Sequence, residues 1–492
     1  MKLKFIAGTL AAAAMLCGAA IAQSVGIGLH QDPPNIDPLY SQAFSDRSVT
    51  YQIFDRLVDI DETLNIVPLL ATSWEVSDDG LVYTLQIREG VKFHDGTPVD
   101  AEAVRYTLNR NLTTPGSARA DELSSISNLE VTGSHTIEIT LDRPNAAFLA
   151  VLSGNGGAIV SPTAAEAAGD NFVAAPVGSG PYVYHDRERQ NHLTLRANED
   201  YWGGAPAIKE LVFRPFPDGD VRTANLLSGA VDIIVPLEGK DVGAVEAASG
   251  YSAVLYDHLG WRALVPNVTR PPFDSEPIRR ALAHALDREA IATVVYENTV
   301  MPLEGPFPPN TGGYNPELRA PAFDLEAARA ALEEVDAVGT EFTLLILPHE
   351  NLHGQFWQAV LTQAGFNVKL EQMEAGPYTE VVNNHNFDAT LVGWSGRIDP
   401  DPQFYPFVHT DGNLNWGGYS DERLDELLDN ARAEMDAEAR ERLYHEVANI
   451  VVDESLMIFI IQQQNLIGVS DELQEIPLIP DGTIRFHGVH LR

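Results

Sequence analysis

The sequence predicts a mixed α/β protein that is divided into two or three domains. The chain has 492 residues, and a domain holds roughly 100–200 residues. Hydrophobic residues make up 45% of the chain and charged residues 21%, which is typical of a protein that buries a core and too apolar for a disordered chain. Segments with the two-residue period of strands alternate with segments of helical spacing. A chain organised in this way has room for a cleft between domains.

The first 22 residues have the pattern of an export signal. Lys2 and Lys4 precede an apolar, alanine-rich run over residues 5–19, and residues 20–22 (AIA) form a small-residue cleavage site. We therefore expect an exported protein that is cleaved after Ala22. A transmembrane anchor is the alternative, because the apolar run is just long enough to span a bilayer.

The single cysteine, Cys17, lies inside this segment. A lipoprotein signal would attach lipid to Cys17, but Leu16 stands where such a signal needs a small residue. After cleavage the mature chain would have no cysteine, which excludes disulfides and thiol catalysis. No later apolar run is long enough to span a bilayer, so we expect a mature protein without stable membrane insertion.

The chain is strongly acidic, with 70 Asp and Glu against 32 Lys and Arg and a formal charge of -38. Loss of the signal removes two lysines and no acid, which makes the mature charge -40. Such a surface repels phosphate backbones and anionic lipid headgroups, so nucleic acid is not an expected partner. Self-repulsion favours a soluble monomer.

A strand, a turn and a helix are expected between residues 81 and 110. Every second residue from Leu81 to Ile87 is apolar, which predicts a strand. Residues 94–98 (HDGTP) predict a turn, and Asp100 is an N-cap for a helix through Arg110. The same reasoning predicts further strands at Ile137, Ile139 and Leu141, at Leu193 and Leu195, and at 208–213.

Helical spacing dominates after Pro277. Near the C-terminus two further helices are expected, the first with Ser420 as its N-cap. Proline- and glycine-rich stretches at 266–273 and 302–316 interrupt the pattern, and the first is the better candidate for a crossing between lobes. The apolar positions of these helices are Ile278, Leu282, Ala285 and Leu286, then Leu424, Leu427, Leu428 and Ala431, then Leu443, Val447, Ile450 and Val451.

Ordered motifs along the chain resemble the signature of the extracytoplasmic solute-binding proteins of family 5, the peptide, nickel and oligopeptide receptors of ATP-binding-cassette importers. The motifs are residues 68–80 (PLLATSWEVSDDG), 83–85 (YTL), 90–98 (GVKFHDGTP), 176–182 (PVGSGPY), 198–206 (NEDYWGGAP), 272–273 (PF), 279–282 (RRAL) and 285–288 (ALDR). The resemblance covers nearly the whole mature chain.

This resemblance implies a periplasmic-binding-protein-like fold of class II with three lobes. Two main lobes would close on a ligand by a hinge, and an extra lobe would be inserted into the first. The implied limits are 1–22 for the cleaved signal, 23–48 with 178–263 and 465–492 for lobe I, 49–177 for lobe II, and 264–464 for lobe III.

The motifs themselves are better explained by structure than by chemistry. Residues 78–80 (DDG) predict a turn between strands, and His94 lies in a second polar turn rather than in a metal site. Residues 178–181 (GSGP) predict a tight loop, with an anion-binding nest as the alternative. The signature therefore indicates the scaffold and leaves the ligand open.

One sequence motif matches the zinc-binding motif of a class of metallopeptidases. His349, Glu350 and His353 satisfy H-E-x-x-H, in which two histidines on one helix face bind zinc and the glutamate activates water. Pro348 precedes the motif and residues 342–347 predict a strand, so the helix is expected to begin near residue 353 or 354. The two imidazoles then need not share a face, and we predict no catalytic residues, no resident metal and no cofactor.

The resemblance also bears on the ligand-binding residues. In the dipeptide-binding branch of the family, an acidic residue three positions after the tryptophan of a Gly-Trp motif takes the ligand's amino group, and an arginine in a strand-to-helix loop takes its carboxylate. Here Arg397 stands at the acidic position, and the loop 348–354 has no arginine. Both anchors depart from the pattern, which puts a simple zwitterionic dipeptide in doubt.

Our hypothesis is that Arg397 binds a ligand carboxylate by a bidentate pair. Glu350 or Asp399 would then take a cationic group. The alternatives are that Arg397 is structural, paired with Asp399 or Asp401, and that the loop alignment is displaced.

Aromatic side chains in polar, loop-like contexts are the other candidates. Trp394, Trp416 and Trp261 have such contexts, where a tryptophan often lines a pocket. By resemblance, the loop around Phe44 and Ser45 and the crossing 259–266 also face the cleft.

The sequence thus predicts a periplasmic receptor that captures a short or modified peptide, or a similar small organic solute, and delivers it to the permease of an ATP-binding-cassette importer. A nickel or metal-chelate carrier is the alternative within binding proteins. A zinc metallopeptidase is the alternative from another class.

Overall fold

A computed structural model describes residues 24–492, without the side chain of His349. The predicted signal and its cleavage after Ala22 lie outside the described residues, so both stay predictions. Within residues 24–492, no helix is long and apolar enough to cross a membrane.

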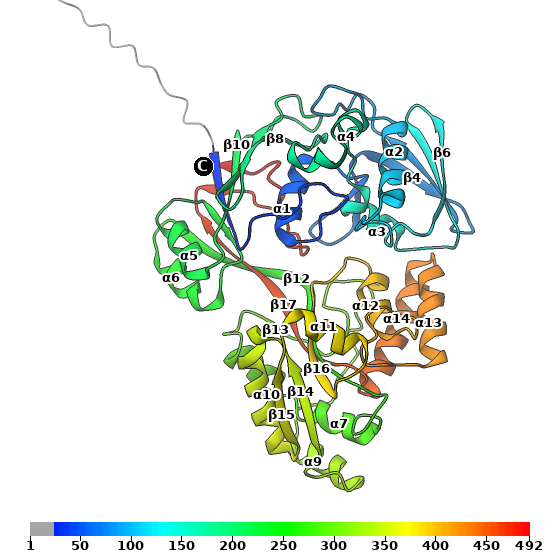
Figure 1. The fold of residues 1–492 in the computed structure, drawn as a ribbon, viewed down its shortest axis with the longest axis vertical. Coiled ribbons are helices and arrows are strands. Elements are labelled where there is room, and N and C mark those ends of the chain that lie inside the picture. Colours follow the sequence, from blue (N-terminus) through cyan, green and yellow to red (C-terminus); the bar gives the residue numbers. More distant parts are fainter. Residues whose placement is uncertain (1–23) are drawn as a thin grey trace, which may run out of the picture.

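The chain forms a mixed α/β fold (Figure 1). Its elements surround several apolar cores, and we name three lobes after these cores. Lobe I packs helix α1 against a sheet in which β1 is parallel to β10 and β11. Its elements are β1 (Ser24–Leu29), α1 (Phe44–Ile53), β8 (Tyr182–Glu188), β9 (His192–Ala197), β10 (Glu210–Pro215), α5 (Gly219–Leu227), β11 (Ile233–Val235), α6 (Val242–Ala247), β18 (Leu473–Gln474) and β19 (His490–Leu491).

Lobe II covers its own antiparallel sheet, of strand order β4-β5-β7-β6, with helix α2. Alternate residues of β5 and β7 point into this core, as their two-residue apolar period predicts. The elements are β2 (Val58–Ile60), β3 (Ile66–Pro68), β4 (Ala71–Val76), β5 (Val82–Ile87), α2 (Ala101–Thr113), β6 (Ile126–Gly133), β7 (Thr136–Leu141) and α3 (Phe148–Leu152). The helix that follows, α4 (Pro162–Ala168), packs on the lobe I core through Ala165.

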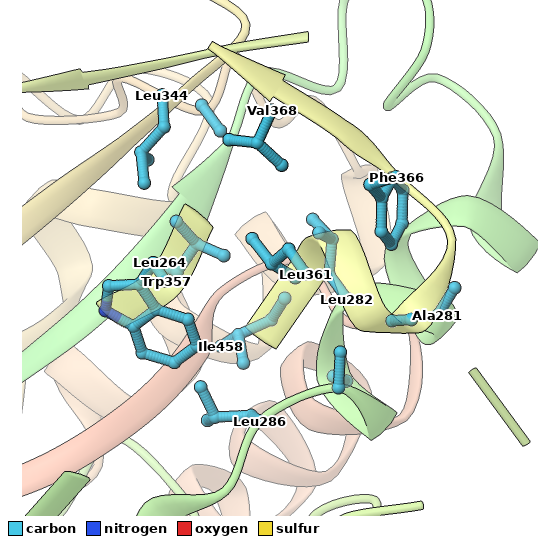
Figure 2. Close-up of a cluster of buried hydrophobic side chains, with 14 of the residues drawn as sticks. Leu264, Ala281, Leu282, Leu286, Leu344, Trp357, Leu361, Phe366, Val368 and Ile458 are labelled. Atoms are coloured by element: carbon cyan, nitrogen blue, oxygen red, sulfur yellow. The ribbon is translucent and has the colours of Figure 1, made fainter. Parts of the chain in front are cut away.

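Lobe III has a core on each face of its sheet. Along β12, Leu264 faces the helices α7, α9 and α10, whereas Ala263 and Val265 face α12, α13 and α14. Figure 2 shows the first core, where Trp357 and Leu361 of α10 meet Leu264 and Ile458. The elements are α7 (Glu276–His284), α8 (Arg288–Val294), β13 (Met301–Pro302), α9 (Leu325–Glu334), β14 (Glu341–Ile346), α10 (Asn351–Ala364), β15 (Asn367–Gln372), α11 (Ala375–Asn383), β16 (Ala389–Trp394), α12 (Pro400–Val408), α13 (Glu422–Ala433) and α14 (Ala437–Asp453).

Two long strands, β12 (Tyr251–Pro266) and β17 (Ile458–Ser470), join lobe I to lobe III (Figure 1). They lie side by side in one sheet of order β15-β14-β16-β12-β17-β11-β1-β10-β9-β8. Their register shifts between Asp257 and Trp261, where regular pairing is interrupted at the boundary between the lobes. The crossing therefore lies inside β12, and the proline-rich stretch 266–273 that we expected to cross follows it.

Several predicted helices are present in the structure, with small differences in where they begin and end. Asp100 caps α2 as predicted, accepting the backbone N–H of Ala103, and the helix runs on to Thr113. The cap of α13 is Asp421 rather than Ser420, because the longer carboxylate side chain accepts the backbone N–H groups of the first turn. Helix α10 begins at Asn351, earlier than expected.

The structure also bears on the predicted tight loop at residues 178–181 and on one predicted lobe limit. A Cβ on Gly178 would lie 2.1 Å from the backbone oxygen of Ile53, so residues 178–181 pack as a tight loop against the end of α1. The predicted limit between residues 48 and 49 falls inside α1, which packs as one helix on the lobe I core through Val49 and Ile53. The remaining lobe limits stay predictions.

Candidate functional site

A cavity of about 330 Å³ lies between the lobes and is lined from all three of them. Lobe I contributes the start of α1, lobe II the segments after α2 and α3, and lobe III the loop between β16 and α12. Leu259, at the irregularity in β12, also lines it. The charged lining residues are Arg47, Arg119, Glu122, Arg397, Asp399 and Asp481.

The start of α1 positions Arg47. The Asp46 carboxylate accepts the backbone N–H groups of Asn35, Gln42 and Ala43 at 2.9–3.1 Å, which holds this end of the helix in place. Arg47 follows directly, and its guanidinium donates one long hydrogen bond, of 3.5 Å, to the carbonyl oxygen of Gln42. Arg47 forms no ion pair with any carboxylate of the described chain.

Arg119 of lobe II is already paired. It is 8% exposed, and its Nη1 donates to both carboxylate oxygens of Glu122 at 2.9 and 3.0 Å. Its Nη2 donates to the carbonyl oxygen of Ser41 at 3.1 Å, which ties lobe II to lobe I beside the cavity.

The Arg397 loop is held to β12 by one glutamine. Gln403 is 2% exposed, and its Oε1 accepts the backbone N–H of Arg397 at 2.7 Å and the indole N–H of Trp394 at 3.1 Å. Its amide donates to the carbonyl oxygen of Leu259 at 3.2 Å. The Arg397 guanidinium lies 4.4 Å from the Trp394 ring and, like Arg47, has no ion pair within residues 24–492.

Gly396 allows this loop to approach β12. Its φ is +76°, and a Cβ at this position would lie 2.3 Å from the backbone carbonyl of Leu259. Only glycine combines that backbone conformation with so close a contact.

The acids that follow Arg397 belong to α12 and its neighbours. Asp399 caps α12 and accepts two hydrogen bonds from Arg440 at 2.7 and 2.8 Å. Asp401 accepts two from Arg432 at 3.0 and 3.1 Å. The carbonyl oxygen of Arg432 in turn accepts the N–H of Ala146 at 3.1 Å, a direct contact between lobes III and II.

Asp481 is likewise matched by a cation. Its Oδ1 accepts from Arg485 at 2.6 Å, and Arg485 also pairs with Asp59 at 3.2 Å. Arg56 forms a further ion pair with Asp59. These two acids and two arginines form a balanced group beside the cavity.

Burial and neighbouring charges shift the pKa of two basic groups at and beside the cavity. Desolvation lowers the pKa of the Arg397 guanidinium, with Glu122 opposing this effect and Arg47 and Arg119 adding to it. Burial, followed by the charge of Arg47, lowers the pKa of His258 to about 4. For both groups burial is the larger cause, and the charge of Arg47 adds to it.

The other predicted ligand-binding residues lie elsewhere. Trp261 is fully buried and packs edge-on against Phe407 and Phe459, because β12 continues through what looked like a loop. The indole N–H of Trp416 donates to Asn383 at 2.8 Å, outside the cavity lining. Of the lobe III tryptophans, Trp394 lies nearest the site, stacked beneath Arg397.

Phe44 and Ser45 do not line this cavity either. Phe44 lines a small apolar space in lobe I, and Ser45 is buried and accepts a hydrogen bond from Gln31 at 3.0 Å. They begin α1 rather than a loop, and the same helix carries Arg47 to the cavity.

The glutamate of the H-E-x-x-H motif, Glu350, has a structural role. Glu350 is 2% exposed; it accepts from Arg262 at 2.7 Å and from the backbone N–H of Leu347 at 3.1 Å, away from the cavity. His353 stacks on Tyr296, and α10 begins after His349. Among the side chains that the structure describes, no group of three or more His, Cys, Asp or Glu is placed to hold a metal ion.

The sequence reasoning missed Arg47, Arg119 and Glu122. These residues are brought to Arg397 only by the packing of three lobes. A weak signal existed for Arg47, since no acid stands three or four residues from it on α1, where a surface arginine would commonly find a partner.

Comparison with known proteins shows which family the chain belongs to. Residues 65–415 match the model of the bacterial extracellular solute-binding proteins, family 5 Middle. The chain belongs to this family. Its fold is accordingly that of the class II periplasmic binding proteins, as the resemblance in sequence predicted.

Individual relatives of this family 5 protein match over almost their full length. A probable di/tripeptide-binding protein 5 of Pseudomonas aeruginosa is 28% identical, covering 97% of each chain. The glutathione-binding protein GsiB of Escherichia coli K12 is 27% identical, covering 98% of this chain and 97% of that one. The periplasmic binding protein DppA of Helicobacter pylori, solved with the peptide STSA, has a TM-score of 0.81 at 25% identity, covering 95% of this chain and 98% of that one.

Proposed function

We propose that this protein is a periplasmic receptor that binds a short peptide in the cavity between its lobes and delivers it, without catalysis, to the permease of an ATP-binding-cassette importer. The observation that carries the proposal is the cavity itself, which all three lobes line. A ligand bound there would contact both main lobes and would hold them together.

The size of the cavity supports a small ligand. Ligand pockets commonly measure about 300–1,000 Å³, and this cavity of about 330 Å³ stands at the low end. The names of the relatives from P. aeruginosa and E. coli, for di- and tripeptides and for glutathione, agree with a ligand of two or three residues.

Arg397 is the residue proposed to bind the ligand's carboxylate. It lines the cavity, is exposed to it and has no ion pair in the described chain. The partner that we considered for a structural role, Asp399, is matched by Arg440, and Asp401 is matched by Arg432. A guanidinium in this position is available for a bidentate pair with a carboxylate.

The proposed cationic contacts through Glu350 and Asp399 have no such support. Glu350 lies outside the cavity lining and pairs with Arg262. Asp399 lines the cavity, but both of its oxygens accept from Arg440.

The proposal is tested with purified mature protein. We expect a thermal-shift screen of di- and tripeptides, glutathione included, to find ligands that raise Tm, because a ligand of the folded state stabilises it. Calorimetry of the best ligand with Arg397→Ala should give an affinity at least tenfold weaker. Unchanged affinity would remove Arg397 from the site, and stoichiometric nickel or zinc in the purified protein would favour the metal carrier or the peptidase instead.

A further inference from the structure

The acidic and basic residues that line the cavity are equal in number, but most of them are not paired with one another. Three arginines and three acids line it, but each acid already has an arginine partner. Glu122 pairs with Arg119, whereas Asp399 and Asp481 pair with Arg440 and Arg485, which lie outside the lining. Within the described chain this leaves the two guanidiniums of Arg47 and Arg397 without an ion pair.

These two arginines approach the cavity from opposite main lobes. Arg47 comes from α1 of lobe I, and Arg397 comes from the loop before α12 of lobe III. They are close enough for the charge of Arg47 to lower the pKa of Arg397. Glu122 attracts Arg397 more strongly than Arg47 repels it, but Glu122 is already paired with Arg119. An anion between the two guanidiniums would offset their mutual repulsion.

One carboxylate can contact two arginines, as Asp59 does with Arg56 and Arg485, but its single negative charge does not balance two guanidiniums. An arginine fork pairs with a carboxylate through two parallel hydrogen bonds, which occupies both of its oxygens. Two arginines on opposite walls are satisfied by two carboxylates. No acid that lines the cavity is left over for a ligand's ammonium group, so the site favours a ligand with net negative charge.

We propose that the cleft selects short peptides that carry a second carboxylate, with Arg397 binding one carboxylate and Arg47 the other. This inference rests on the proposed function, in which the cavity binds a peptide. A dicarboxylate peptide of two or three residues would join lobe I to lobe III through two charge-assisted pairs. A peptide with only its terminal carboxylate would leave one guanidinium unpaired.

The test compares dipeptides of equal length on the full mature protein. We expect calorimetry at low salt to give Ala-Glu or Glu-Ala at least tenfold tighter binding than Ala-Ala, and Lys-Ala weaker binding than Ala-Ala. The preference should fall as salt rises from 20 to 500 mM, since salt screens partly exposed charges. Equal or tighter binding of Ala-Ala overturns the inference.

Variants of Arg47 then test whether this residue binds the second carboxylate. Arg47→Gln should bring the affinity ratio of the acidic dipeptide to Ala-Ala close to one, and Arg47→Lys should give an intermediate ratio, because lysine keeps the charge without the fork. Arg442→Gln, on the exposed face of α14 outside the cavity, should leave the ratio unchanged. Because both affinities are measured on one preparation, a partly unfolded variant does not change their ratio.

The two proposals fail in different ways. A ratio that Arg47→Gln leaves intact overturns the role of Arg47 while peptide binding stands. Binding of neutral peptides without any acidic preference overturns the inference alone. If neither the acidic nor the neutral peptides bind, the proposed function fails and the inference fails with it.

Discussion

The helix layer of lobe III and the wall of the cavity both carry arginines, but they use them differently. Arg432 and Arg440 each donate two hydrogen bonds to an aspartate, Asp401 and Asp399 respectively. Arg47 and Arg397 have no carboxylate partner in the described chain. The first pair holds α12 against α13 and α14, whereas the second pair lines the cavity and donates only to nearby carbonyl and hydroxyl oxygens.

This difference teaches that distance along the chain does not tell a structural charge from a binding one. Arg397 and Asp399 stand two residues apart in one loop and line the same cavity. Asp399 is held by Arg440 and caps a helix, so its removal disturbs the fold. Arg397 is held through its backbone N–H, by the Trp394 ring, and by hydrogen bonds from its Nη1 to the Gly396 carbonyl oxygen at 2.7 Å and the Ser395 hydroxyl at 3.4 Å. None of these is an ion pair, so its removal should disturb binding.

The largest effect is expected from breaking the structural pair. The side chains of Arg440 and Asp399 are 13% and 11% exposed. Arg440→Met removes the partner of Asp399, and an uncompensated carboxylate near the interior costs about 3–5 kcal/mol. Arg397→Met should cost less than about 1 kcal/mol, the scale of an exposed contact with an aromatic ring. Urea unfolding followed by circular dichroism measures both, and an equal loss in the two variants would contradict the division into two sets.

A smaller effect on stability, with a large effect on binding, is expected at Gly396. Alanine there would have a φ of +76° and a Cβ 2.3 Å from the Leu259 carbonyl, so the loop must move away from β12. We expect a loss of about 1–3 kcal/mol and peptide affinity at least tenfold weaker, because Arg397 moves with the loop.

Gly376 on α11 provides the matched control for this substitution. A Cβ there meets nothing within 4 Å and its φ is not positive, so Gly376→Ala should be neutral or stabilising by up to about 1 kcal/mol. If Gly396→Ala behaved like Gly376→Ala in unfolding and in calorimetry, the close approach of the loop to β12 would not position Arg397.

Local patterns in the sequence were sufficient for the mixed α/β class and for several strands and helices, whereas the arrangement in lobes was implied by the resemblance to the family. The period of β5 and the cap at Asp100 are determined by neighbouring residues, so they can be read without tertiary information. Trp261 shows the limit of such patterns. Its neighbours Gly260 and Arg262 look like a loop, but pairing with β16 and β17 keeps β12 extended through them.

The candidate site could be predicted only in part, for a physical reason. Arg397 stood out because it occupies a family position with the opposite charge. Arg47 and Arg119 lie in different lobes, and their approach to Arg397 depends on how those lobes pack. Their different roles depend further on whether an acid such as Glu122 lies within reach, which no local pattern reports.

The smallest expected effect tests the positive charge of the cavity through a neighbouring histidine. Burial and then Arg47 lower the pKa of His258 to about 4, below its ordinary value of about 6.5. Protonation therefore favours the unfolded chain, and this contribution to stability is complete above pH 6.5 and is lost as the pH falls towards 4. Nuclear magnetic resonance titration, with the His258 signal assigned by its loss in His258→Asn, should show a slightly higher pKa in Arg47→Gln. Since burial is the larger cause, the shift should be small; a downward shift, or none, would mean that the Arg47 charge is neutralised within the protein and is not available to a ligand.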